Sequence, residues 1–218
     1  SIGRNFEEAI LKAVRSLENK VDHLEVPYLK EMNAEELMDV ISQHTDERMY
    51  AIAEAIRKGV SIDEIHEETK IDNFFLEKIN NIVNLEKELA SSPWDLETFK
   101  KAKKNGFSDA YLAKCYKTTP NVIYNFRKEH NIFPVYKFID TCAAEIDCYV
   151  PYFYSTYEHQ NESVRSDRKK IVVLGSGPIR IGQGVEFDYT TVHAIWGIIE
   201  KGYEAIIINN NPETVSTD

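Results

Sequence analysis

The chain contains few of the residues on which secreted, membrane-spanning or metal-binding proteins depend. It has only three cysteines in 218 residues, an odd number without metal-ligand spacing, which favours a reducing compartment over a disulfide framework. Its six histidines include no H-E-x-x-H pair. No apolar stretch approaches membrane length, and the N-terminus does not resemble a signal peptide. These absences predict a cytoplasmic protein with neither a metal site nor a membrane partner.

Positive charge is also scarce. There are 26 Lys and Arg residues against 36 Asp and Glu residues, which gives a formal net charge of −10. This charge argues against nucleic acid and anionic membranes as partners, because both attract basic surfaces. The composition is otherwise that of an ordinary globular protein, with 43% hydrophobic and 28% charged residues. The length suffices for one large or two small domains.

The most informative segment is an apolar run that opens into a glycine loop near the C-terminus. The run at residues 169–174 has the composition of a buried parallel strand, and several glycines follow it. A helix and a second apolar strand at residues 204–209 come next. Strand, glycine loop, helix and strand make half of a doubly wound nucleotide-type fold, whose ligands bind at the carboxyl ends of the strands. We therefore expect a parallel β-α-β unit with a cleft at that edge.

The glycine loop departs from the two common phosphate-binding motifs. Gly175 and Gly177 begin a G-x-G, but Arg180 stands where G-x-G-x-x-G requires its third glycine. Gly177 and Gly182 have the spacing of a P-loop, but Gln183 replaces the lysine that contacts phosphate. The sequence therefore does not predict a generic dinucleotide or NTPase site.

Capping signals divide most of the remaining chain into helices. Residues 5–19 read as one helix with Asn5 as its N-cap and Glu8 in capping-box position. The apolar stripe of this helix is expected to pack on a core outside this chain. Residues 33–131 read as a series of helices. The caps expected there are Asn33 with Glu36, Ser61 with Glu64, Ser92-Pro93, Thr119-Pro120, Gly59, Gly106 and Asn131. Residues 135–139 and 149–154 are expected to be extended, and residues 160–168 to form a linker.

The helical region contains an internal repeat. Gly59 recurs as Gly106 and Ser61 recurs as Ser108, a spacing of 47 residues. The same spacing relates Ile52 to Phe99, Ala55 to Ala102, Ile65 to Leu112 and Leu76 to Ile123. Two such units can bury one helical core between them, because repeat units generally need a neighbour to cover their apolar faces.

Each repeat also has the form of a helix-turn-helix. In the second repeat, residues 108–115 would be the first helix and residues 120–130 the recognition helix. That helix would offer Asn121, Tyr124, Asn125 and Lys128 to bases. A packing or oligomerisation domain suits the acidic charge better, and DNA binding is the rival interpretation.

The glycine loop and the segments around it resemble one family. The string Gly-Ser-Gly-Pro-Ile-Arg-Ile-Gly-Gln-Gly-Val-Glu-Phe-Asp-Tyr at 175–189 and Asn-Asn-Pro-Glu-Thr-Val-Ser-Thr-Asp at 210–218 are similar to the carbamoyl phosphate synthetase large subunit. They match the start of its second synthetase half. Residues 135–145 and 154–158 resemble the segment just before that half, and residues 2–9 resemble the end of the first half.

This resemblance implies a domain organisation and a reaction. Residues 1–20 would close the first ATP-grasp domain, 21–165 would form a helical oligomerisation domain, and 166–218 would begin the second pre-ATP-grasp domain. The family makes carbamoyl phosphate from bicarbonate, glutamine-derived ammonia and two ATP, for arginine or pyrimidine biosynthesis. The parent would use ATP with Mg or Mn, and K, and would associate with itself and with a glutamine amidotransferase small subunit. Those ligands would bind ATP-grasp domains outside this chain, which is expected to hold no cofactor and to be inactive.

The same resemblance places the glycine loop beside a tunnel that carries carbamate between the two halves. Gly184 would be a wall residue without a side chain, and Glu186 a carboxylate that faces the path. The expected tunnel or cleft residues, none of them catalytic, are Gly175, Gly177, Arg180, Gly182, Gln183, Gly184, Glu186, Asp188, Asn209, Asn211, Glu213 and Thr214. The alternative is a purely structural strand-to-helix turn, in which Glu186 and Asp188 only suit the helix dipole.

Taken as a whole, the sequence predicts a mostly α fold, a helical oligomerisation domain, followed by a truncated α/β unit with parallel β-α-β order. The alternative function is a stand-alone helical, helix-turn-helix-like interaction module fused to a nucleotide-type fold. The stop at Asp218, after only two strands, favours the first interpretation, because no natural domain is expected to close there.

Overall fold

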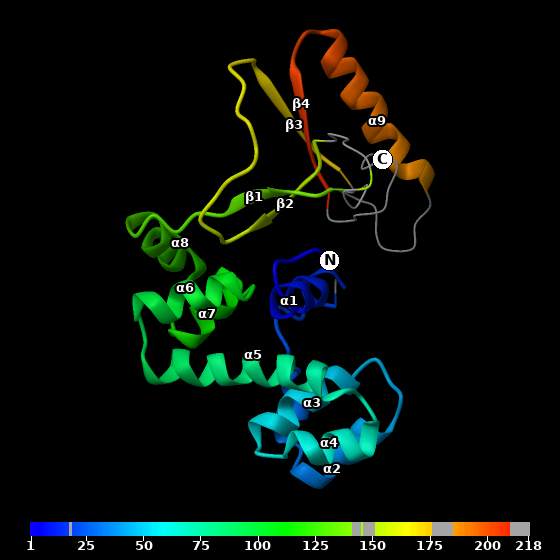
Figure 1. Ribbon diagram of the computed structural model, residues 1–218, viewed down its shortest axis with the longest axis vertical. Helices are drawn as coiled ribbons and strands as arrows, with labels where there is room; N and C mark the ends of the chain where they lie inside the picture. Colours follow the sequence, from blue (N-terminus) through cyan, green and yellow to red (C-terminus); the bar gives the residue numbers. More distant parts are fainter. Residues whose placement is uncertain (18, 141–144, 146–150, 176–184, 210–218) are drawn as a thin grey trace. The chain divides into compact units, whose positions relative to one another are not determined.

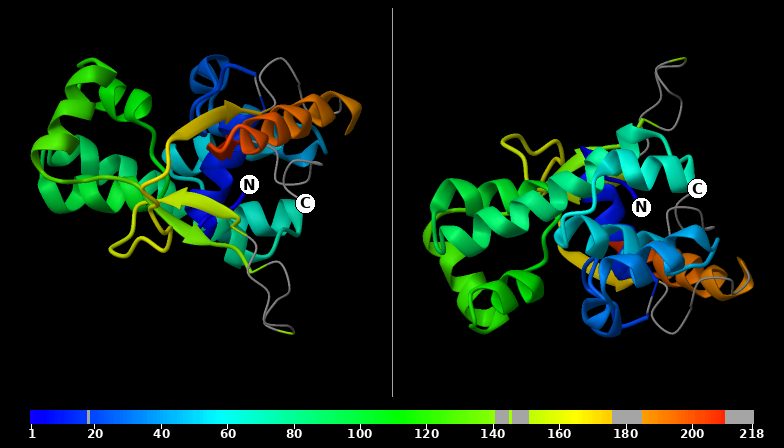
Figure 2. Two further views of the ribbon diagram at one scale, coloured as in Figure 1. Left: turned by 90° about the horizontal axis from the view of Figure 1, so that it is seen from above. Right: turned by 90° about the horizontal axis from the view of Figure 1, so that it is seen from below.

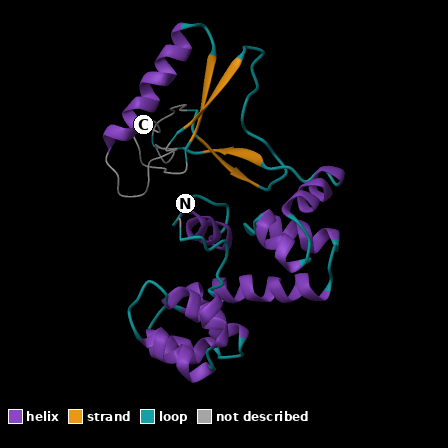
Figure 3. Ribbon diagram, turned by 180° about the vertical axis from the view of Figure 1, so that it is seen from behind, coloured by secondary structure: helices purple, strands orange, loops and turns teal. Residues whose placement is uncertain are grey.

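The computed structural model describes all residues except 18, 141–144, 146–150, 176–184 and 210–218. The chain divides into two compact units. The helical unit contains residues 2–135 and 155–160, and the α/β unit contains residues 136–154 and 161–218 together with Ser1. Figure 1 labels their elements, and Figure 3 shows that helices dominate the first and that strands appear in the second. The mostly α fold with a truncated α/β unit is confirmed.

The helical unit has one apolar core, to which its successive helices contribute. Its elements are α1 (Phe6–Ser16), the 3-10 helix η1 (Pro27–Glu31), α2 (Ala34–Ser42), α3 (Arg48–Arg57), α4 (Ile62–Thr69), α5 (Asn73–Ser91), α6 (Leu96–Lys104), α7 (Asp109–Cys115) and α8 (Pro120–Glu129). Side chains at helical spacing, such as Leu76, Ile79 and Val83 of α5, are buried in this core. Burial of such stripes is the main term that stabilises short helices, which are marginal alone.

The 47-residue repeat is confirmed in the backbone. Helices α4 and α5 start at Ile62 and Asn73, and α7 and α8 start 47 residues later at Asp109 and Pro120. The two turns match as well: Gly59 and Gly106 both have positive φ, of 90° and 84°. The apolar pairs of the repeat, from Ile52 and Phe99 to Leu76 and Ile123, are all buried. The period in the sequence therefore reflects two copies of one helix–turn–helix–turn–helix fold.

Most of the predicted caps are present, and two need correction. Asn33 with Glu36 and Ser61 with Glu64 form complete capping boxes. Ser92-Pro93 does not begin a helix, because Ser92 is the C-cap of α5 and Asp95 caps α6 through the Thr98 N–H. At α1, Asn5 accepts the Glu8 N–H as expected, but the Glu8 carboxylate binds the N–H of Arg4 rather than that of Asn5.

The expectation that α1 packs on a core outside the chain is wrong. Leu11 and Val14 of α1 are fully buried, and the helix packs on α5. Gly106 explains how α1 comes so close to the second repeat: a Cβ at that position would lie 2.8 Å from the Cα of Glu8. The glycine thus allows backbone contact between α1 and the turn that follows α6.

A buried ion network links the two repeats. Arg57 binds both carboxylate oxygens of Glu86 at 2.7 and 2.8 Å, and His23 Nε2 donates to the same carboxylate at 2.8 Å. Burial alone would raise the pKa of Glu86, but its hydrogen bonds to Arg57 and His23 outweigh burial and lower that pKa to about 2. The His23 ring stacks on Tyr111 of the second repeat. Burial lowers the pKa of His23.

This network predicts acid sensitivity. Because the folded pKa of Glu86 lies below its ordinary value of 4.5, its stabilisation is complete above about pH 5 and is lost as the pH falls from 4.5 toward 2. We expect the free energy of unfolding to drop by about 2–3 kcal/mol through this window. Urea unfolding at pH 7, 5 and 3 measures the loss. Glu86→Gln should be less stable at pH 7 but show a shallower decline; equal slopes would contradict the assignment.

The strands among the described residues form two sheets. β1 (Val135–Phe138) pairs with β2 (Phe153–Thr156), and β3 (Lys170–Leu174) pairs with β4 (Glu204–Ile208). β3 and β4 are parallel, in the register Lys170 with Glu204 to Leu174 with Ile208. Helix α9 (Val185–Glu200) joins them and packs on both, as Figures 1 and 2 show. The predicted parallel β-α-β order is confirmed.

The expectation that strand β3 is buried is wrong for this chain. Val172 is 52% exposed and Leu174 is 73% exposed. The register places these two side chains beside Ile206 and Ile208, which are exposed as well. Apolar composition predicted a strand covered on both faces, whereas α9 can cover only one.

Candidate functional site

The structure brings together two of the residues predicted to line the cleft. Gly175 and Asn209 directly follow the adjacent parallel strands β3 and β4. The N–H of Gly175 donates to the carbonyl of Ile208 at 2.8 Å, which extends the ladder to the end of the sheet. A Cβ at Gly175 would lie 3.1 Å from the Cδ1 of Ile207, so a side chain there would press on β4. Asp188, in the first half of α9, is buried.

Most of the predicted site lies outside the described residues. This group consists of Gly177, Arg180, Gly182, Gln183, Gly184, Asn211, Glu213 and Thr214. Glu186 belongs to α9, but its side chain is also outside the description. Convergence of these residues on one cleft therefore stays a prediction, supported by the parallel register of the two strands that precede them.

The described part of this edge carries little charge. Gly175, Asp188 and Asn209 supply no cation for a phosphate and only one carboxylate. Throughout the described ranges, no group of three His, Cys, Asp or Glu side chains could hold a metal ion. None of the described helices is long and apolar enough to cross a bilayer.

The two helices expected for a helix-turn-helix in the second repeat are present as α7 and α8, which pack together, but a basic side chain of α8 faces inward. Arg127 of α8 is 8% exposed, and its guanidinium binds Asp109 at 2.7 Å. Tyr124, Asn125 and Lys128 of the same helix are exposed. Weak DNA affinity stays a prediction from the net charge.

A second cluster, which sequence reasoning missed, joins the two ends of the helical unit. We call residues 155–160 the strap. This segment belongs to the helical unit, although the rest of that unit ends at Val135, 20 residues before Ser155. Thr156 Oγ1 donates to Glu8 Oε2 of α1 at 3.0 Å, in a buried position. Lys12 Nζ of α1 donates to the Ser155 carbonyl at 2.6 Å. Local sequence signals read Glu8 only as a helix-capping residue.

The strap also rests on charged residues of the second repeat. The Tyr157 ring lies 4.8 Å from the Lys103 ammonium and 5.7 Å from the Arg127 guanidinium. Both cations bind Asp109, at 2.7 Å each. Burial lowers the pKa of Lys103 to about 8, and the nearby Asp109 only partly opposes that shift. We call Lys103, Asp109 and Arg127 the buried triad.

The triad has no equivalent in the first repeat. The positions 47 residues earlier hold Ile56, Ile62 and Asn80. The signal for it was therefore in the sequence, because Lys103 and Asp109 stand where the first repeat has two isoleucines. Its partner Tyr157 could not be found in this way, because it lies outside the repeat.

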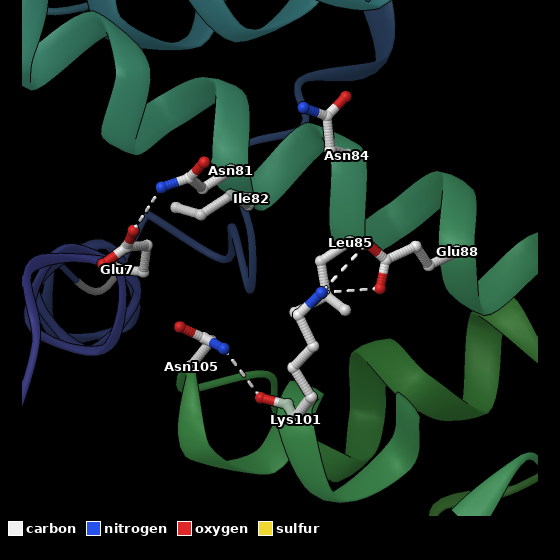
Figure 4. Close-up of a pocket in the computed structure, with 8 residues that line it drawn as sticks. All are labelled: Glu7, Asn81, Ile82, Asn84, Leu85, Glu88, Lys101 and Asn105. Carbon is white, nitrogen blue, oxygen red and sulfur yellow. Dashed lines mark hydrogen bonds and ion pairs between the residues drawn. The ribbon is translucent and has the colours of Figure 1, made fainter. Parts of the chain in front are cut away.

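A polar pocket of about 370 Å³ lies between α1, α5 and α6 (Figure 4). Its polar side chains largely form hydrogen bonds and ion pairs with neighbouring residues of the pocket. Asn81 donates to Glu7 Oε1 at 2.9 Å, and Lys101 Nζ binds Glu88 at 2.7 Å. Asn105 Nδ2 donates to the Lys101 carbonyl at 2.8 Å. The pocket pairs no nucleophile with a general base, so it indicates polar packing between helices rather than catalysis.

Comparison with known families agrees with this architecture. A model of the carbamoyl-phosphate synthetase large chain oligomerisation domain matches residues 1–131. A model of the carbamoyl phosphate synthase pre-ATP-grasp domain matches residues 167–218. The first range covers the two helical repeats with α1, and the second covers β3, α9 and β4. Because the first match alone spans more than half of the chain, this protein belongs to the carbamoyl phosphate synthetase large chain family, whose members are ATP-dependent ligases.

Proposed function

We propose that this chain is the part of a carbamoyl phosphate synthetase large chain that mediates association between copies and contributes one wall of the carbamate path. By itself it is catalytically inactive. ATP, Mg or Mn, and K act in other domains of the parent, in the cytoplasm, and a glutamine amidotransferase small subunit supplies ammonia. The observation that carries the association role is the match of the helical unit to an oligomerisation domain.

An exposed aromatic cluster on the helical unit supports this role. Phe74 and Phe75, in the first turn of α5, are 55% and 45% exposed. The Phe6 ring of α1 lies 6.3 Å from Phe74 and 5.5 Å from Phe75. Exposed aromatic side chains that touch one another are typical of interface cores rather than of a monomer's surface. An isologous dimer would bury this aromatic cluster against its own copy.

The proposed wall of the carbamate path rests on the sheet edge. Gly175 and Asn209 leave the carboxyl ends of neighbouring parallel strands, where ligands of such folds bind. The glycines that follow Gly175 in the sequence lie outside the described residues, and they would add no side chains to a path at this edge. The chain would guide carbamate here without chemistry of its own.

Substitution of the aromatic cluster tests the association role. We expect the wild-type chain to dimerise, and Phe74→Ser with Phe75→Ser to raise the dimer dissociation constant by at least about 100-fold, because each lost aromatic contact counts in both copies. Analytical ultracentrifugation across a wide concentration range measures the constant.

Val122→Ser is the matched control. Val122 occupies the position of Phe75 in the second repeat and is 42% exposed, and the residue before it is Asn121, where the first repeat has Phe74. It should leave the dissociation constant within about threefold of the wild type. A strictly monomeric wild-type chain would overturn the association role; a double variant that dimerises normally would remove the aromatic cluster from the interface.

A further inference from the structure

Thr156 of the strap and Glu8 of α1 are 148 residues apart in the sequence and meet at the buried Glu8 carboxylate. Glu8 is 1% exposed. Its Oε2 accepts from the Arg4 N–H at 2.7 Å and from Thr156 Oγ1 at 3.0 Å, and its Oε1 binds Lys12 Nζ at 2.8 Å. Arg4 lies just before α1, Lys12 lies within it, and Thr156 lies in the strap. One side chain thus fixes the point where the chain enters the helical unit and the point where it leaves.

The surrounding contacts make these two points move together. The Lys12 ammonium that pairs with Glu8 also binds the Ser155 carbonyl at 2.6 Å and the Ile2 carbonyl at 3.0 Å. Further along the strap, the Tyr157 ring contacts the two cations of the buried triad, and Lys104 Nζ lies 3.4 Å from His159 Nε2. Opening the strap would leave a buried carboxylate with an unmade hydrogen bond, which is costly for a charged group. The strap and the start of α1 should therefore open as one unit.

We propose that Glu8 and Thr156 are positioning residues of a joint that holds the two synthetase halves of the parent in a fixed relation. The inference rests on the proposed function, because residues before α1 would lead to the first half and Asn161 onward to the second. Carbamate must cross from one half to the other before it decomposes. A joint that keeps the ends of the helical unit together would hold the path aligned without touching either reaction.

Hydrogen exchange on this 218-residue chain tests whether the joint exists. Thr156→Val keeps the shape of the side chain and removes only the hydroxyl, so amides of the strap and of the first turn of α1 should exchange about 10- to 100-fold faster. Thr156→Ser restores the hydroxyl and should stay close to the wild type. Thr98→Val, which removes an exposed hydroxyl of α6, is the matched control and should change neither segment.

The exchange pattern decides the outcome. Unchanged protection in Thr156→Val, or faster exchange in the strap alone, would overturn the joint. If Thr156→Val also speeds amide exchange in α2–α4, the variant has lost its fold, and Lys12→Met provides the local test in its place. Loss of the Lys12 ammonium should again speed exchange in the strap and in α1 together, while the amides of α2–α4 stay protected.

The same variants in the full-length parent with its small subunit test the coupling. Thr156→Val should lower carbamoyl phosphate formed per bicarbonate-dependent ATP hydrolysed by about tenfold, and Thr156→Ser should restore the ratio. Both partial reactions should survive. An unchanged ratio with faster exchange would show a joint that only stabilises the fold and would overturn the positioning role. A wild-type parent without synthetase activity would instead refute the proposed function, while the exchange result would still decide on the joint.

Discussion

Gly106→Ala is expected to lower the free energy of unfolding of the helical unit by about 4 kcal/mol, whereas Gly59→Ala should lower it by only about 1 kcal/mol. The two glycines occupy equivalent turns with φ of 84° and 90°, so both substitutions bring the same backbone strain. Only at Gly106 would the new Cβ meet a neighbour, the Glu8 backbone, at 2.8 Å. At Gly59 nothing lies within 4 Å of that Cβ.

Urea unfolding followed by circular dichroism at 222 nm measures both losses, and the matched repeat makes the comparison internal. The difference between the two variants reports the contact with α1 alone. If the two substitutions lower the free energy of unfolding by the same amount, backbone conformation accounts for the whole effect. In that case α1 does not lie against the turn as described. A melting temperature lower by roughly 10 °C for Gly106→Ala would accompany the expected loss.

The largest expected effect on activity is in the full-length parent, where Gly184→Phe should abolish carbamate transfer. If Gly184 lines the path, a Phe side chain adds more bulk than a close-packed wall can absorb. Overall synthesis should fall by about 100-fold or more, equivalent to nearly 3 kcal/mol of activation free energy. Bicarbonate-dependent ATP hydrolysis and ATP synthesis from added carbamoyl phosphate should both persist, because neither reaction uses the path.

Gly184→Ala provides the graded control, since a single methyl group should leave most of the transfer intact. Loss of both partial reactions with Gly184→Phe would mean that the substitution has disrupted the loop, in favour of a purely structural turn. Normal overall synthesis would show that Gly184 does not border the path.

Features encoded by neighbouring residues could be predicted from the sequence. Asn33 and Ser61 were identified as caps because the acceptor and the Glu that completes each box lie three residues apart. The repeat could be recognised because every matched pair of positions has the same spacing of 47 residues. β3 and β4 followed from apolar runs bounded by turn residues. Ser92-Pro93 misled, because a Ser-Pro pair suits the end of one helix and the loop beyond it as well as the start of the next.

Features that depend on distant residues could not be predicted. The contact between Glu8 and Thr156 leaves no local pattern, and the close approach of α1 to Gly106 is visible only in three dimensions. Exposure of Val172 and Leu174 could not be inferred either. The composition of a strand shows that its side chains can be buried, but it does not show whether another element of this chain covers them.

The buried triad makes the two repeats non-interchangeable. Where the first repeat has Ile56 and Ile62, the second has Lys103 and Asp109, and the Tyr157 ring lies within 6 Å of the Lys103 and Arg127 cations of this second repeat. If the order of the repeats were exchanged in the gene, the strap would meet Ile56, Ile62 and Asn80 in place of the buried triad, and none of these three side chains is a cation. The three charged residues of the second repeat thus determine which of the two copies contacts the strap, and they give a direction to an otherwise similar pair of repeats.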